Sequence, residues 1–179
     1  MVFVDESGLM MAPLVRRTWS PLGKTPLLLQ RTRSHRKVSA IAGIAASPKG
    51  RRLRLFFRLH PNQNITATLC IAFLVQLRRQ IRGNMVVLWD RLQAHRSRKM
   101  KRYLRRNPRI AAFYFPPYAP DLNPIEYGWG YLKTNPLANY APENETILAR
   151  RAHKHLRCMA KRPNLLRGFI EHARLSFFD

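Results

Sequence analysis

The chain has 179 residues, of which 46% are hydrophobic, and it carries 33 Lys and Arg residues against 9 Asp and Glu. This length suits one domain with a substantial core, and the hydrophobic fraction excludes a basic disordered tail. A net charge of +24 predicts a polyanionic partner, most simply a nucleic acid. No apolar run approaches the roughly 18 residues of a membrane span, and Asp5 and Glu6 near the N-terminus exclude a signal peptide. We therefore expect a cytoplasmic protein.

The two cysteines, Cys70 and Cys158, lie far apart in stretches with a helical pattern. No pair of cysteines or set of Cys and His has the spacing of a zinc site. Buried, reduced thiols are the ordinary interpretation.

The predicted elements begin with strands and then alternate between helices and strands. The pattern predicts an apolar strand at 1–5 and a turn-rich stretch after it, then strands at 37–47 and 51–59 joined by a turn at 47–50. It continues with a helix at 64–83, a strand at 85–89, a basic helix at 97–108, a strand at 109–115, a helix at 123–133 and two basic helices from residue 143 onward.

This order predicts an α/β fold with a mixed five-stranded sheet, helices on both faces and a C-terminal helical tail. We divide it into a main unit at 1–140 and a basic helical extension of the same domain at 141–179. The carboxyl ends of strands in such sheets open onto a ligand crevice. Asp5 and Asp90 each follow an apolar strand, and a site is expected there.

Asp5 and Asp90 are unusual because a carboxylate beside an apolar strand is costly to desolvate unless a cation receives it. The structural alternative is an ion pair with an arginine, for which Arg91 is adjacent to Asp90. Glu126 also has a structural alternative, since Asn123 and Pro124 form a good helix start and Glu126 falls at the capping-box position. The prolines around it would equally hold a ligand in a fixed direction.

Three carboxylates without a cysteine cluster favour a hard cation, Mg²⁺ or Mn²⁺. Two such ions can stabilise both the attacking and the leaving oxygen of a phosphodiester displacement. In so basic a chain the expected substrate is the backbone of DNA or RNA.

Three segments, "FVDESG", "LWDRLQAH" and "FPPYAPDLNPIEYGWGYLK", resemble the signature blocks of DDE transposases of the mariner superfamily, in particular the bacterial insertion-sequence enzymes. The resemblance implies a ribonuclease H-like fold in which Asp5, Asp90 and Glu126 bind two Mg²⁺ or Mn²⁺ ions as catalytic residues. It also implies DNA cleavage at transposon ends, followed by attack of the freed 3′-hydroxyl on target DNA, with no covalent enzyme intermediate. A homodimer on DNA and a place at the bacterial nucleoid are expected with it.

Two features depart from the family pattern. Arg91 follows the second aspartate, where the family usually has Asn, and it could compete with the ions or contact substrate phosphate. The family's N-terminal helix-turn-helix region would lie before Asp5, where this chain has only four residues. Either a separate helix-turn-helix chain supplies DNA recognition, or the chain is a truncated copy.

Several further residues are candidates for DNA contact. His95 occupies the family's usual histidine position, where it could touch substrate, orient a ligand or serve the structure. Lys133 could hold phosphate near the ions or be solvated at a helix end, and Arg16 and Arg17 lie in a basic stretch, "LVRRTWSPLGKTP", that also resembles the family. Trp129 is expected to pack its helix onto the sheet. Four basic clusters are candidate DNA tracks: "RTRSHRK", "KGRRLR", "HRSRKMKRYLRR" and "RRAHKHLRCMAKR".

Two of the remaining acids are expected to have no direct part in the chemistry. Asp121 is interpreted as a turn residue of the proline-rich loop, and Glu6 as an acid that supports the site from behind or faces solvent.

These observations lead to three candidate functions. The first is the catalytic domain of a metal-dependent transposase, and the second is an inactive remnant that only binds DNA. The third, an RNA-associated basic protein, is disfavoured because it needs no ordered set of three carboxylates.

Overall fold

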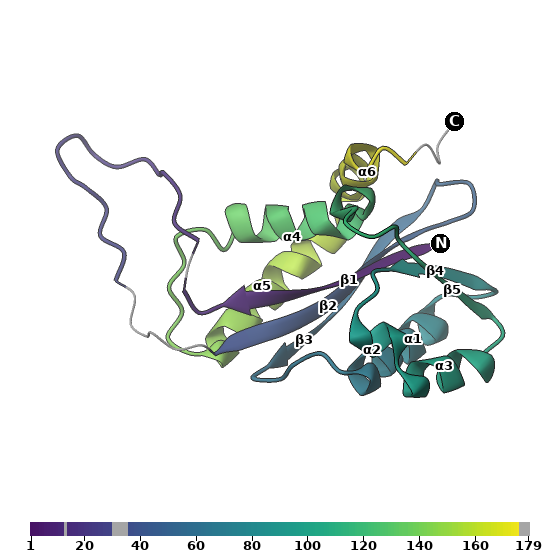
Figure 1. The fold of residues 1–179 in the computed structure, drawn as a ribbon. Coiled ribbons are helices and arrows are strands. Elements are labelled where there is room, and N and C mark those ends of the chain that lie inside the picture. Colours follow the sequence, from purple (N-terminus) through teal and green to yellow (C-terminus); the bar gives the residue numbers. More distant parts are fainter. Residues whose placement is uncertain (13, 30–35, 176–179) are drawn as a thin grey trace.

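The computed structural model describes residues 1–12, 14–29 and 36–175. A mixed five-stranded sheet lies between two layers of helices, as the sequence predicts (Figure 1). The strands, in the spatial order β3-β2-β1-β4-β5, are β1 (Val2–Met10), β2 (Lys37–Ala46), β3 (Leu53–Pro61), β4 (Met85–Trp89) and β5 (Ile110–Tyr114). The helices are α1 (Ala67–Gln80), α2 (Gln93–Arg96), α3 (Arg98–Arg105), α4 (Pro124–Thr134), α5 (Glu145–Ala160) and α6 (Pro163–His172), with a 3₁₀ turn, η1, at Pro120–Leu122.

The sheet joins an antiparallel half to a parallel half. β1 pairs antiparallel with β2, and β2 with β3, whereas β4 pairs parallel with β1 and with β5. β2 is buried on both faces along nearly its whole length, which suits its run of small and branched apolar residues. β1 is the central strand, so it carries its side chains to the middle of the molecule.

β1 is longer than the sequence pattern predicts. The prediction ended it at Asp5, but the strand continues to Met10. Residues 6–10 pair with the first half of β2, with Glu6 opposite Ile41 and Met10 opposite Lys37. This pairing with a neighbouring strand outweighs the local turn preference of Ser7 and Gly8. Asp5 therefore lies in the middle of a strand.

The helix boundaries show smaller differences. α1 begins at Ala67 because the Thr66 side chain caps it, accepting a hydrogen bond from the Leu69 N–H at 3.4 Å. The short helix α2, which follows β4 directly, was not predicted. It stacks His95 on Trp89, the last residue of β4.

Each face of the sheet has its own core. On one face α4, α5 and α6 cover the sheet with buried residues that include Trp129, Leu156 and Ile170. On the other face α1 and α3 contribute Phe73 and Met100 to the second core. The two C-terminal helices thus form part of a layer over the sheet (Figure 1).

The cysteine prediction is half correct, since Cys70 is buried but Cys158 is exposed. Across the described residues we find no helix with the length and apolar character of a membrane span.

Candidate active site

The three acids singled out in the sequence line one cleft. Asp5, Asp90 and Glu126 face a space of about 460 Å³. The rest of the lining comes from the segment after β4, the proline-rich loop and the start of α4, namely Arg91, Leu92, residues 115–120 and Asn123. Segments far apart along the chain thus meet at the crevice that the sheet topology predicts.

The parallel pairing of β1 and β4 sets Asp5 and Asp90 level with each other. The register pairs Val2 with Val87 and Phe3 with Leu88. Two further steps along both strands reach Asp5 and Asp90. The two carboxylates therefore leave neighbouring strands at the same height.

The start of α4 is tied directly to β1. Asn123 caps the helix with its side-chain oxygen, which accepts from the Ile125 N–H at 3.5 Å. Its side-chain nitrogen donates to the Val4 carbonyl at 3.2 Å, one residue before Asp5. A single buried amide thus fixes the position of the first turn of α4, which carries Glu126, against the strand that carries Asp5.

The capping-box alternative for Glu126 does not describe this helix start. The Asn123 backbone N–H donates to the Pro120 carbonyl at 2.9 Å instead of to the Glu126 side chain. The Glu126 side chain is exposed and lines the cleft. It is available to a ligand.

Asp5 is a buried carboxylate, with only 7% of the residue exposed. The indole Nε1–H of Trp129 donates to its Oδ2 at 2.9 Å. Burial, together with the charges of Glu126, Glu6 and Asp90, raises the pKa of Asp5 to about 8, although the Trp129 bond opposes this rise. Among the described residues no Lys or Arg forms an ion pair with Asp5, so the arginine alternative does not hold.

Asp90 has the opposite environment, because its side chain is 53% exposed and well supplied with donors. Its Oδ1 accepts from the Leu92 N–H at 2.9 Å and lies 3.0 Å from His95 Nδ1. The hydrogen bonds from His95 and Leu92 lower the pKa of Asp90 against the effect of burial. Its partner is thus a histidine rather than Arg91.

Burial also raises the pKa of Glu126, and the charge of Asp90 adds to this rise. Lys133 opposes it. Lys133 is half-buried near the end of α4, and its charge acts on Glu126.

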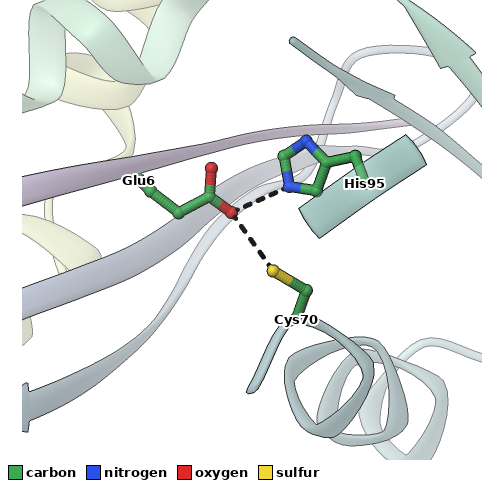
Figure 2. A group of neighbouring side chains, drawn as sticks. All are labelled: Glu6, Cys70 and His95. Carbon is green, nitrogen blue, oxygen red and sulfur yellow. Dashed lines mark hydrogen bonds and ion pairs between the residues drawn. The ribbon is translucent and has the colours of Figure 1, made fainter. Parts of the chain in front are cut away.

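His95 is not positioned for direct DNA contact, one of the roles expected for it. It has no exposed surface, and its ring stacks on Trp89 with the ring centroids 4.2 Å apart. Nε2 lies 3.0 Å from Glu6 Oε1, which is also 3.8 Å from the sulfur of Cys70 (Figure 2). Burial by itself lowers the pKa of His95, but hydrogen bonds to Asp90, Cys70 and Glu6 raise it to about 12.

Sequence reasoning missed two contacts of the site, the Trp129 bond to Asp5 and the place of Cys70 beside Glu6. A signal for the second existed. Successive strand residues point to opposite faces of a sheet, so an acid directly after Asp5 must face the other helix layer.

The predicted arginines lie in different places. Arg91 is exposed and lines the cleft, whereas Arg16 and Arg17 belong to the arm, by which we mean residues 14–29. The arm projects away from the sheet and its helices (Figure 1). Its base is held by Asn139, whose side chain bonds the Arg16 backbone N–H and carbonyl, each at 2.8 Å. Most of the basic cluster "RTRSHRK", at 31–35, lies outside the described residues.

Comparisons with known proteins agree with this geometry. The sequence model of one family, described as DDE superfamily endonuclease, matches residues 1–148. Among curated proteins no sequence relative was found.

Solved structures of the Mos1 mariner transposase share the fold. The paired-end complex with Mg matches with a TM-score of 0.67 at 16% identity, over 97% of this chain and 53% of that chain. The strand transfer complex gives 0.66 at 16%, over 97% and 51%. The catalytic domain solved with Raltegravir and Mn gives 0.61 at 14%, over 97% and 78%.

The chain thus spans about half the length of the transposase chains in the two DNA complexes, and the likeness shows that their ribonuclease H-like fold is also the fold of this chain. The family match covers most of the sequence and includes the strands and the helix start that bear the three acids. The chain belongs to the DDE superfamily endonucleases.

Proposed function

We propose that the chain is the catalytic domain of a transposase, which cleaves DNA at the ends of a mobile element and transfers the freed strands to target DNA. One observation carries this proposal. Three carboxylates from β1, the end of β4 and the first turn of α4 line one cleft in a protein whose net charge is +24.

The donor set fits divalent cations. Carboxylate oxygens are the ligands that Mg²⁺ and Mn²⁺ prefer. The raised pKa values of Asp5 and Glu126 reflect burial and mutual repulsion of negative charge, which a cation in the cleft would relieve. We propose that Asp5, Asp90 and Glu126 hold two ions, which when bound activate the attacking oxygen and stabilise the leaving oxygen of the phosphodiester.

The protein's own residues orient these ligands and receive the DNA. Trp129 and His95 hold Asp5 and Asp90 respectively from opposite layers. Arg91, exposed at the cleft, contacts a substrate phosphate beside the scissile bond, and Lys133 offsets negative charge near Glu126. Arg16 and Arg17, exposed on the arm, follow the DNA backbone further out.

The names of the fold relatives support the same reaction class. The Mos1 structures include paired-end complexes with Mn and with Mg, a complex with the left transposon end, and a strand transfer complex. We carry their metals and their DNA over to this chain as part of the proposal.

We also propose that the chain acts as a homodimer on DNA in the bacterial nucleoid. The arm supports the dimer because it exposes several large apolar side chains on one segment: Trp19, Leu22 and Leu27 are each at least 90% exposed, and a second chain could cover them. A helix-turn-helix region on another segment or chain would read the element's ends.

The test is a cleavage assay with the purified chain, a supercoiled plasmid and Mg²⁺ or Mn²⁺. The substrate should also be offered as a duplex with the ends of the element that encodes the chain. We expect nicking that requires the metal and disappears in Asp90→Ala. Equal nicking by both proteins, or by neither, would favour the remnant that only binds DNA.

A further inference from the structure

Glu6, His95 and Cys70 form a hydrogen-bonded group (Figure 2). We propose that Glu6 and His95 are a positioning pair, which holds the Asp90 carboxylate so that one of its oxygens stays free for a metal ion. This inference rests on the proposed function, because it gives these residues a task only if Asp90 binds a cation.

The alternation of β1 places Glu6 behind the site. Asp5 contacts Trp129 on the α4 side, and the next side chain must point to the other face. There Glu6 meets Cys70 from α1 and His95 from α2. Of the two neighbouring acids in β1, Asp5 therefore lines the cleft and Glu6 contacts His95 on the opposite face of the sheet.

His95 is held too firmly to turn. Its ring is stacked nearly parallel to the Trp89 indole, with an angle of 7° between the planes, and no part of the residue is exposed. Nε2 is engaged by Glu6 at 3.0 Å and Nδ1 by Asp90 Oδ1 at 3.0 Å. An ionised carboxylate only accepts hydrogen bonds, so Nδ1 is the donor to Asp90 Oδ1.

The fixed His95 ring in turn fixes one oxygen of the Asp90 carboxylate. Its Oδ1 receives two donors, the Leu92 N–H and His95 Nδ1, whereas within the described part of the chain no hydrogen bond reaches Oδ2. Since the side chain lines the cleft, one oxygen is fixed and the other faces the position of a ligand. Support of this kind from behind a metal ligand changes metal affinity or activity by about 10- to 100-fold.

The same three side chains are also of the types that zinc binds, and their ligand atoms all lie within 4.8 Å of one another. The hydrogen-bonded arrangement is favoured because Nε2 and Oε1 are 3.0 Å apart. Two ligands at about 2.0–2.1 Å from one tetrahedral zinc would stand about 3.3 Å apart. The carboxylate is already at hydrogen-bond distance from the ring.

The test compares Glu6→Gln with wild type and with Glu171→Gln, a matched control at an exposed position of α6. Glu6→Gln keeps the size of the side chain and removes its charge. We expect a 10- to 100-fold weaker affinity for Mn²⁺ in a titration without DNA. We expect the same rise in the Mn²⁺ concentration that half-saturates plasmid nicking, and unchanged affinity for a DNA duplex in EDTA. Glu171→Gln should match wild type in all three measurements.

Wild-type Mn²⁺ affinity in a folded Glu6→Gln protein would overturn the positioning pair. So would stoichiometric zinc in the purified wild-type protein that is lost in Cys70→Ser. If Glu6→Gln does not fold, a ¹H–¹⁵N spectrum of wild type decides the matter. A slowly exchanging proton on Nδ1 of His95 supports the pair, and an unprotonated Nδ1 refutes it.

The proposed function can fail separately. Wild-type protein that binds Mn²⁺ but does not cut DNA would refute the nuclease proposal. The Mn²⁺ affinities of Glu6→Gln and wild type would then still decide for or against the positioning pair.

Discussion

Asp5 in β1 and Asp90 directly after β4 lie level with each other and line the same cleft, yet their burial and hydrogen-bond partners differ. Asp5 is buried, is repelled by other acids and has one neutral donor, Trp129. Asp90 is half-exposed and receives two donors, one of them from His95. The pKa is raised to about 8 at Asp5 and lowered at Asp90.

The comparison shows that the two helix layers provide different electrostatic environments for the site. The α4 layer supplies an aromatic cover and the third carboxylate, so it concentrates negative charge. The α1–α3 layer supplies His95 and compensates charge. On the α4 side the negative charge of Asp5 has no cationic partner among the described residues, whereas on the other side His95 already partners Asp90. Replacing each aspartate in turn should therefore have different effects on metal binding and on stability.

The largest effect is expected on cleavage. Asp5→Asn, Asp90→Asn and Glu126→Gln should each lower metal-dependent plasmid nicking by about a thousandfold or more, because a lost ligand removes several kcal/mol of stabilisation. The control is Asp121→Asn, at an acid of η1 that does not line the cleft, which should nick like wild type. Activity within tenfold of wild type in any of the three variants would remove that residue from the site.

The next effect concerns pH and metal affinity. Because the pKa of Asp5 is about 8, metal binding must displace a proton at lower pH. Mn²⁺ affinity, measured by calorimetric titration, should therefore rise by up to about tenfold per pH unit between pH 6 and pH 8, then level off. Asp5→Asn should remove this slope and Asp90→Asn should keep it. If Mn²⁺ affinity rose equally steeply with pH in wild type and in Asp5→Asn, the proton displaced by the metal could not be assigned to Asp5.

A third prediction concerns stability without metal. A carboxyl whose folded pKa is raised loses stability as pH rises from its unfolded pKa to about 8. In EDTA, Asp5→Asn should therefore melt higher than wild type by about 5 °C or more at pH 8, with a smaller gap at pH 5. Asp90→Asn should melt lower at pH 8, because the lowered pKa of Asp90 stabilises the fold above its unfolded value. If the melting temperatures of Asp5→Asn and Asp90→Asn at pH 8 shifted in the same direction from wild type, the predicted contrast between the two aspartates would be refuted.

The smallest effect is expected for Trp129→Phe, which keeps an aromatic ring under the helix but removes the donor to Asp5. We expect a loss of about 1–2 kcal/mol in the free energy of unfolding, measured by urea denaturation. The pH at which Mn²⁺ affinity levels off should also move upward, since the Trp129 bond lowers the pKa of Asp5. The matched control, Trp19→Phe, changes a fully exposed indole on the arm and should alter neither quantity.

The sequence by itself determined the order of the strands and the longer helices, the mixed sheet and the choice of the three acids. Local signals were sufficient because apolar runs mark strands, and because Asn123 and Pro124 are residue types preferred at the cap and the first position of a helix. The resemblance of three short blocks to a known family added the expected chemistry, and the family match agrees with it.

Only the tertiary structure decided the contacts that distinguish Asp5 from Asp90. The length of β1 depends on pairing with β2, whose partner residues for 6–10 lie 27 to 35 residues later in the chain. The partners of Asp5 and Glu6 come from α4, α1 and α2, which the sheet topology brings to opposite faces of one strand. Hydrogen bonds and burial between such distant residues leave no periodic pattern in a single sequence, so the charge balance of the site could be known only once the chain was folded.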